Sequence, residues 1–184
     1  MDDPTLEAAR RGDRDALALL LRSLQDVWYR MSLSLLSDPD LAQDAVQETA
    51  IRFMKQLPGF RGESQLKTWS LGICLNVARE IRRWARGRGL RGPGSLEDGP
   101  EVEGKSDDGE LPVEALVRGE QIEAIRAVLG TLPERQREAV VLRFFEEMSV
   151  EQTAAAMNCA TGTVKATVHQ ALRTMRKKLE QQGQ

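Results

Sequence analysis

The side chains best suited to chemistry lie near the C-terminus, on the polar face of a helix that apolar residues from Val164 to Leu179 predict. In the major groove of DNA, lysine can donate to the acceptors of guanine, and glutamine can pair bidentately with adenine. The residues of this candidate reading face are Thr163, Lys165, Ala166, Thr167, His169 and Gln170. The residues that suit phosphate contacts, which position without specifying sequence, are Arg173, Arg176, Lys177 and Lys178. The alternative is a solvated basic face that complements the negative end of the helix dipole.

A short helix and a tight turn precede this basic helix and would position it. Ser149 and Gln152 stand three residues apart before a run of small residues, which is the pattern of a capping box at a helix start. Residues 158–162 then suit a tight turn, with Thr161 as the candidate cap of the last helix. This order of elements predicts a helix-turn-helix, whose second helix enters the major groove.

A glycine-containing loop before another basic helix forms a second candidate site. An exposed aromatic ring beside amide and hydroxyl groups can stack and read single-stranded bases. The candidate residues are Phe60, Arg61, Gly62, Glu63, Ser64, Thr68, Trp69 and Asn76. Phe60 is favoured as a functional ring because it lies in the loop, whereas Trp69 and Trp84 continue an apolar stripe and are predicted to be core residues.

Four helices are expected to hold that loop. Their expected starts are Asp3-Pro4, Asp13, Asp38-Pro39 and Ser64. Apolar residues recur in steps of three and four along the second and fourth helices, at Leu17, Leu20, Leu24, Val27, Met31, Leu35, Leu66, Trp69, Ile73, Val77, Ile81 and Trp84. The opposite face of the fourth helix is basic and includes Arg79, Arg82 and Arg83. The pattern predicts one four-helix domain.

The third of these helices carries a polar face made of Asp44, Gln47, Glu48 and Arg52. Their spacing places them together on one side of the helix. From the residues alone, salt bridging within the helix is the favoured interpretation of this face.

Charge is segregated along the chain, although the net charge is only −2. Residues 61–91 contain eight basic and two acidic residues, and residues 149–184 contain five basic and two acidic residues. Between them, residues 92–114 contain eight acids and one lysine, with abundant glycine and proline. Such a segment cannot bury enough apolar surface to offset its ordering entropy, so it is expected to be disordered when free. The predicted fold is all-α, with helical domains at 1–90 and 114–184 joined by a flexible acidic linker at 91–113.

Composition argues against an enzyme, a metalloprotein and a membrane protein. Cys74, Cys159 and His169 offer no metal cluster and no nucleophile pair, and both cysteines are expected to be buried. There is no phosphate-binding glycine loop before a helix, and no paired carboxylate in an apolar setting. No stretch approaches the ~20 apolar residues that cross a bilayer, and the acidic start is unlike a signal peptide. We expect a cytoplasmic protein without cofactor, metal or membrane insertion.

With these motifs in order, the chain resembles the extracytoplasmic-function class of bacterial RNA polymerase sigma factors. Residues 44–49 are similar to the region 2 helix that binds the polymerase clamp, so the resemblance implies core RNA polymerase as a partner and Asp44, Gln47, Glu48 and Arg52 as contacts. Residues 59–64, 67–69 and Asn76 are similar to the segment that melts and reads the minus-ten element of promoter DNA. By this resemblance, Phe60 and Asn76 line a pocket for a flipped-out base, while Arg79, Arg82 and Arg83 hold the backbone.

The C-terminal motifs resemble region 4, which reads the minus-thirty-five element. They are residues 132–138, 157–159 and 162–165. Family members often carry cations where this chain has Ala166, Thr167 and Gln170, so the promoter sequence does not follow from the resemblance. The resemblance also implies an anti-sigma factor as a partner. The alternatives are a stand-alone helix-turn-helix regulator and a sigma-like decoy that binds an anti-sigma protein.

Overall fold

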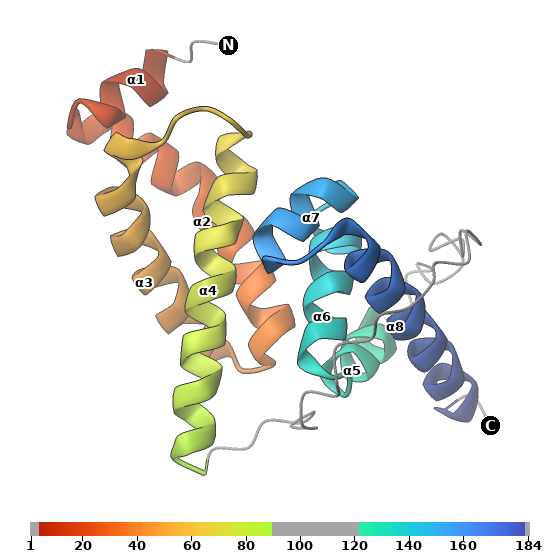
Figure 1. The fold of residues 1–184 in the computed structure, drawn as a ribbon. Coiled ribbons are helices and arrows are strands. Elements are labelled where there is room, and N and C mark those ends of the chain that lie inside the picture. Colours follow the sequence, from red (N-terminus) through yellow and green to blue (C-terminus); the bar gives the residue numbers. More distant parts are fainter. Residues whose placement is uncertain (1–3, 90–121, 183–184) are drawn as a thin grey trace. The chain divides into compact units, whose positions relative to one another are not determined.

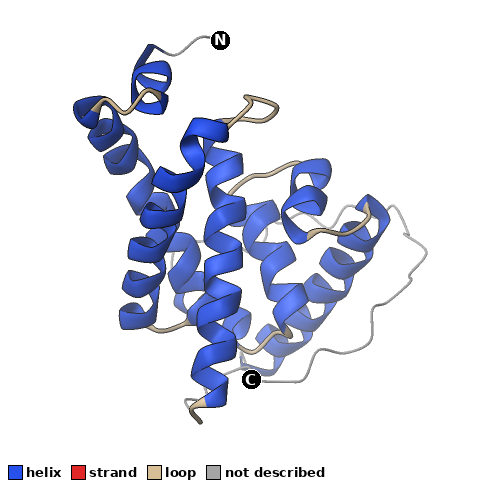
Figure 2. Cartoon of the chain, turned by 60° about the vertical axis from the view of Figure 1, so that its left-hand side comes forward, coloured by secondary structure: helices blue, strands red, loops and turns tan. Residues whose placement is uncertain are grey.

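The computed structural model describes residues 4–89 and 122–182, and every regular element in these ranges is a helix (Figure 2). The chain divides into two compact units, residues 1–89 and 90–184. The expected all-α class with two helical parts is therefore confirmed. The linker expected at 91–113 lies outside the described residues.

The first unit contains four α-helices and one short 3-10 turn, η1 (Figure 1). The bounds of these elements are α1 Pro4–Arg10, α2 Arg14–Leu36, α3 Pro39–Gln56, η1 Leu57–Gly59 and α4 Leu66–Gly87. The caps form as predicted at two starts, because Asp13 accepts from the Ala16 amide and Asp38 accepts from the amides of Asp40 and Leu41. The long helices α2, α3 and α4 pack against one another.

The expected cap of α4 is wrong. The N-cap position is occupied by Gln65, not Ser64, and its side chain makes no capping hydrogen bond. Close to this start Ser70 and Leu71 are fully buried, and tertiary packing supplies most of the stability of helices in proteins.

The core of the first unit is centred on Trp28, which is fully buried on α2. Its indole Nε1 donates to the Ser70 hydroxyl of α4 at 3.0 Å, so the polar edge of the ring is satisfied inside the core. The predicted stripe on α2 placed Val27 and Leu17 inward, but both are half-buried. The buried residue beside Val27 is Trp28, one position later, and the buried residue beside Leu17 is Ala16, one position earlier, because the face that packs on the other helices is set by the rotation of α2.

Trp84, at the end of the predicted apolar stripe on α4, is not a core residue. Its side chain is 50% exposed, and the Arg88 guanidinium lies 4.2 Å from its ring centroid. Near the end of α4 the buried position is Ala85, one residue after Trp84, so the apolar periodicity read from the sequence does not mark the buried face there.

The second unit contains α5 Ile122–Gly130, α6 Glu134–Val140, the π-helical turn η4 Val141–Phe145, α7 Val150–Met157 and α8 Thr161–Gln182. The predicted capping box is confirmed, because Ser149 Oγ accepts from the Gln152 amide and the Gln152 side chain accepts from the Ser149 amide. The turn is shorter than expected: α8 begins at Thr161, which is its first helical residue.

One buried and one half-buried cation hold the start of α6 and the side of α8. The Arg137 side chain is 4% exposed and donates to the carbonyl oxygens of Gly130 and Leu132. The Lys178 ammonium donates to the Thr131 hydroxyl at 2.6 Å, so this lysine joins α8 to the turn after α5. Lys178 is thus a structural residue as well as a predicted phosphate contact, and the structural role of Arg137 is not predicted from the sequence.

The two cysteines differ in exposure. Cys74 is fully buried, with its sulfur 3.3 Å from the Ser32 hydroxyl, as expected. Cys159 is half-buried, which contradicts the expectation that both lie in a core. Within the described ranges, no helix is long and apolar enough to cross a membrane, and no three His, Cys, Asp or Glu residues are grouped as metal ligands.

Glu147 provides a test of the geometry before α7. Its φ is 56°, in the left-handed region that costs a residue with a Cβ roughly 1–2 kcal/mol. Glu147→Gly is therefore expected to stabilise the second unit by about 1 kcal/mol, measured by hydrogen exchange of the α6 and α7 amides. Gln170→Gly, inside α8, is the control and is expected to destabilise the same unit by about 1 kcal/mol. A loss of stability in both variants would contradict the strained geometry.

Candidate nucleic-acid interface

Phe60 is an anchor of the loop and not an exposed ring. It is only 6% exposed, and its centroid lies 4.8 Å from that of Trp69. Trp69 in turn lies 5.5 Å from Phe53, and Phe53 lies 5.4 Å from Trp28. This aromatic chain connects the loop after α3 to the centre of the core. The expectation of an exposed Phe60 is wrong, because a ring in a glycine-containing loop can still fold back onto the neighbouring helix.

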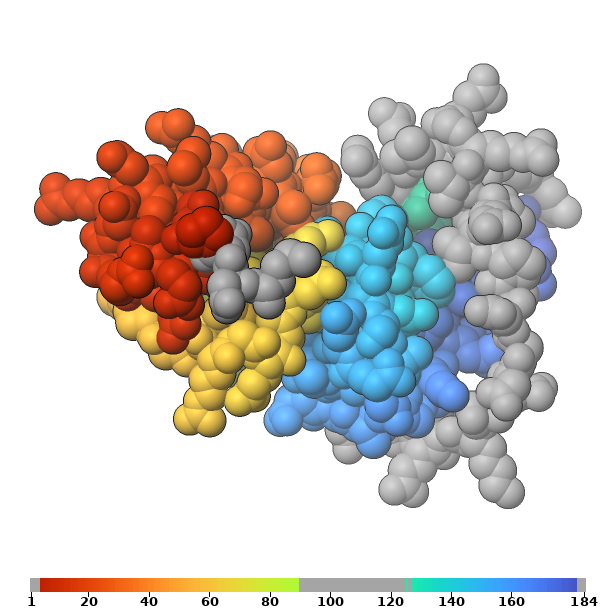
Figure 3. Space-filling model, turned by 90° about the horizontal axis from the view of Figure 1, so that it is seen from above, coloured from red at the N-terminus to blue at the C-terminus, as the bar shows by residue number. Residues whose placement is uncertain are grey.

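The exposed part of the loop is its polar tip. Arg61 and Glu63 have side chains that are 84% and 78% exposed, with 3.9 Å between their charged atoms, and Ser64 is also exposed. Gly62 has a φ of +73°, which glycine adopts without strain. In the space-filling view the golden end of the unit, where α3 passes into α4, lies at the surface near the red α1 (Figure 3). The loop therefore presents polar groups on an aromatic anchor.

Asn76 is exposed on α4, whereas Thr68 and Trp69 are half-buried nearer the helix start. Asn76 is seven positions after Trp69, which corresponds to roughly 10 Å along the helix axis. Asn76 lines a hollow of about 240 Å³ between α3 and α4 that does not include Phe60. We call it the α3–α4 hollow, and its lining residues are Arg52, Gln56, Ile73, Asn76, Arg79, Glu80 and Arg83.

Arg52 is engaged in two ion pairs in this hollow. Its Nε donates to Glu48 Oε1 at 2.7 Å, which confirms the predicted pairing within α3. Its Nη1 and Nη2 donate to both carboxylate oxygens of Glu80 on α4, at 2.8 and 2.7 Å. These hydrogen bonds lower the pKa of Glu80 below its usual range. This pair between two helices is not predicted from the sequence, although Glu80 is the only acid between Leu66 and Gly87.

The other members of the predicted polar face of α3 are exposed or half-buried. Asp44 and Gln47 are exposed, and Glu48 is half-buried beside Arg52. The same helix exposes two apolar side chains, Ile51 at 41% and Met54 at 38%. These apolar residues were absent from the predicted site, and they give the exposed side of α3 a mixed acidic and apolar character.

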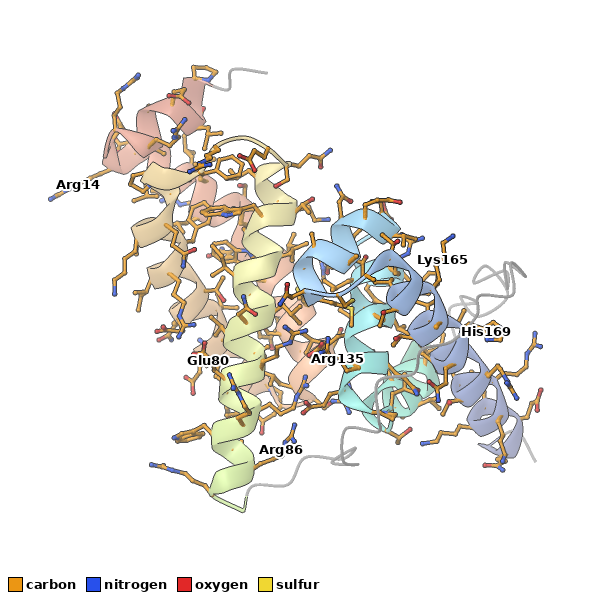
Figure 4. All side chains as sticks on the ribbon, in the orientation of Figure 1. Arg14, Glu80, Arg86, Arg135, Lys165 and His169 are labelled. Carbon is orange, nitrogen blue, oxygen red and sulfur yellow. The ribbon has the colours of Figure 1, made fainter. Side chains whose placement is uncertain are left out.

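The arginines of α4 divide by environment. The Arg82 Nη2 donates to the Leu35 carbonyl at the end of α2 at 3.0 Å, so Arg82 holds two helices together. Arg79 is half-buried in the hollow, and Arg83 is exposed. Figure 4 shows Glu80 and Arg86 on different sides of α4. The basic face expected from sequence thus contains both structural and solvent-facing cations.

The candidate reading face of α8 and the basic residues after it are exposed or partly covered, and none is buried. Lys165, Gln170, Arg173, Arg176 and Lys177 are exposed, and Figure 4 shows Lys165 and His169 along the outer side of the helix. The partly covered members of this face are Thr163, Ala166, Thr167 and His169. The opposite face is buried at Val164, Ala171, Leu172 and Met175. A capped short helix, a three-residue turn and a helix with an open polar face have the form of a helix-turn-helix.

Both units match known families of transcription proteins. Residues 20–90 match sigma-70 region 2, and residues 122–175 match sigma-70 region 4. The chain is 34% identical to the RNA polymerase sigma-H factor of Pseudomonas aeruginosa, over 97% of this chain and 94% of that protein. It is 29% identical to the ECF RNA polymerase sigma-E factor of Escherichia coli K12, over the same fractions of the two chains.

Two solved structures have a similar fold. One is the sigma factor RpoE in complex with the anti-sigma factor NepR from Bartonella quintana, with a TM-score of 0.65 and 24% identity over 89% of this chain and 96% of that one. The other is CnrH in complex with the cytosolic domain of CnrY, with a TM-score of 0.68 and 20% identity over 96% and 95% of the two chains.

Because Phe60 is buried, its removal is expected to destabilise the first unit. Phe60→Ala is expected to lower the free energy of unfolding of the first unit by about 3 kcal/mol, because it removes a buried ring and leaves a cavity beside Trp69. Trp84→Ala, at an exposed ring on the same unit, is expected to cost less than about 1 kcal/mol. Urea unfolding followed by tryptophan fluorescence measures both. Equal losses would mean that Phe60 is not an anchor.

Proposed function

This chain belongs to the extracytoplasmic-function type of RNA polymerase sigma factors, and we propose that it directs core polymerase to promoters by reading two DNA elements with its two units. Region 2 is assigned to residues 1–90, the connector to 91–113 and region 4 to 114–184. Sigma factors are transcription initiation factors, so the chemistry of this chain is recognition and strand separation.

The observation that carries the proposal is the open polar face of α8. Its apolar residues are buried while Lys165, Gln170 and Arg173 face solvent, which leaves hydrogen-bonding groups available to base edges and phosphates. The helix follows a capped α7 and a short turn, the arrangement that inserts a recognition helix into the major groove. We assign this face to the minus-thirty-five element.

We assign binding of the minus-ten element to the loop tip and to α4. Asn76 is exposed and can read the hydrogen-bonding edge of a base, and Arg61 and Ser64 at the loop tip are open to solvent. Phe60 packs on Trp69 and so fixes the position of the loop. Its proposed contribution to holding a flipped base is therefore indirect: it keeps the loop tip in place. Arg79 and Arg83 are assigned to the DNA backbone.

Core polymerase is assigned to the exposed side of α3. Asp44 and Gln47 face solvent beside Ile51, and a polar rim around apolar side chains is typical of protein interfaces. An anti-sigma factor is a further proposed partner, because two structures of similar fold, RpoE and CnrH, are complexes of this kind.

Base reading by Asn76 is tested with Asn76→Ala. This change is expected to reduce promoter opening by up to about tenfold, because a hydrogen bond to an unpaired base is lost. Closed-complex affinity is expected to change less than about twofold, since the duplex is held elsewhere. Permanganate reactivity of unpaired thymines and filter binding measure the two steps. Gln25→Ala, an exposed amide on α2, is the control, and equal losses in opening and closed binding would reject base reading.

Polymerase docking is tested by charge reversal on α3. Asp44→Lys combined with Glu48→Lys is expected to weaken association with core polymerase by about 100-fold or more, because like charges then face the partner surface. Asp15→Lys combined with Asp26→Lys makes the same charge change on α2 and serves as the control. Association is measured by fluorescence anisotropy of the labelled full chain. An unchanged affinity in the α3 variant would remove the docking proposal and favour a polymerase-independent regulator.

A further inference from the structure

The α3–α4 hollow has the size and charge of a small anion site. Its volume of about 240 Å³ is below the ~300–1,000 Å³ of pockets that enclose drug-sized ligands, so it suits one phosphate and part of its nucleotide. Three guanidinium groups line it, from Arg52, Arg79 and Arg83, together with the amides of Gln56 and Asn76. A nucleic-acid backbone is the ligand class that such a lining favours.

Glu80 stands in the middle of this cationic lining. It is on the same face of α4 as Asn76, four residues earlier, and Arg83, three residues later. An uncompensated carboxylate at this position would repel a phosphate that approaches Asn76 or Arg83. The fold therefore has to neutralise Glu80 if α4 is to bind a DNA strand.

Arg52 supplies that neutralisation from the neighbouring helix. Two parallel N–H···O bonds of 2.8 and 2.7 Å join its guanidinium to Glu80, a geometry that fixes direction as well as charge. The third donor, Nε, bonds Glu48 at 2.7 Å and holds the guanidinium plane in place. Glu80 is thereby turned toward α3 and away from the outer side of α4.

We propose that Arg52 is a positioning residue for promoter DNA, which pairs Glu80 so that the α3–α4 hollow accepts a phosphodiester of the separated strand beside Asn76. The identity of the DNA rests on the proposed function, whereas the charge arrangement follows from the ion pairs alone. Arg52 then acts on DNA binding through Glu80, in place of the direct polymerase contact that the family resemblance implies for it.

A charge-rescue experiment on the full chain tests the proposal. The variants are Arg52→Gln, Glu80→Gln and the two combined. Arg10→Gln is the matched control, because Arg10 also forms an ion pair, 2.7 Å from Glu7 on α1, and its loss changes the net charge equally. The probe is a fluorescein-labelled oligothymidylate of about twelve nucleotides at low salt, without polymerase, read by anisotropy. Affinity for core polymerase and urea stability are measured on the same preparations.

The proposal expects a pattern that a purely structural role would not give. Arg52→Gln should weaken oligonucleotide binding by about fivefold, because a cation is lost and Glu80 is left unpaired. Glu80→Gln should tighten binding by about twofold, and the double variant should return to within about twofold of the unaltered chain. Arg10→Gln should change binding by less than about twofold, and Arg52→Gln should leave polymerase affinity unaltered.

Three results would overturn the proposal. A double variant that binds as weakly as Arg52→Gln would show that Arg52 only holds α3 to α4. Weaker binding by Glu80→Gln would show that Glu80 itself contributes to DNA contact, and this variant remains informative if Arg52→Gln fails to fold. If Arg52→Gln weakened only the affinity for core polymerase, Arg52 would be a polymerase contact and not a positioning residue for DNA. Failure of the proposed function itself would appear separately, as an unaltered chain that does not bind core polymerase.

Discussion

The aromatic chain from Trp28 through Phe53 and Trp69 to Phe60 is the interaction on which the first unit depends. Successive ring centroids lie 4.8 to 5.5 Å apart, within the range in which aromatic rings attract beyond their buried area. Each ring comes from a different element, so the chain joins α2, α3, α4 and the loop. An irregular loop with an exposed polar tip is thereby held by the same contacts that stabilise the core.

Cations in this protein serve two purposes that the sequence alone does not separate. Arg82, Arg137 and Lys178 donate to backbone carbonyls or a hydroxyl within their own unit, and so hold helix ends and turns. Lys165, Arg173 and Arg83 face solvent. The number of basic residues in the sequence is therefore larger than the number of cations that the fold leaves exposed. The single acid of α4, Glu80, is paired with Arg52 of α3. Recognition depends on which cations the fold leaves on the surface.

Prediction from sequence was accurate where local physics decides and failed where packing decides. The caps at Asp13, Asp38 and Ser149 were predicted because each side chain bonds an amide two or three residues away. Ser64 is not a cap, because α4 begins one residue later than a Ser64 cap would place it, with Gln65 at the N-cap position. Phe60 was expected on the surface and is buried, because its partner Trp69 lies on a helix whose approach no local pattern encodes.

By itself the sequence determined the helical class, the order of the helices, the helix-turn-helix and the segregation of charge, since periodicity, capping and composition are properties of short segments. Only the tertiary structure decided that Trp28 and not Val27 lies at the centre, that Trp84 is outside it, and that Asn76 shares a hollow with Arg52 and not with Phe60. Those outcomes depend on how far one helix extends past another and on the exact rotation of each helix about its axis. A one-residue change in that rotation is about 100°, which is enough to exchange a core residue for a surface one.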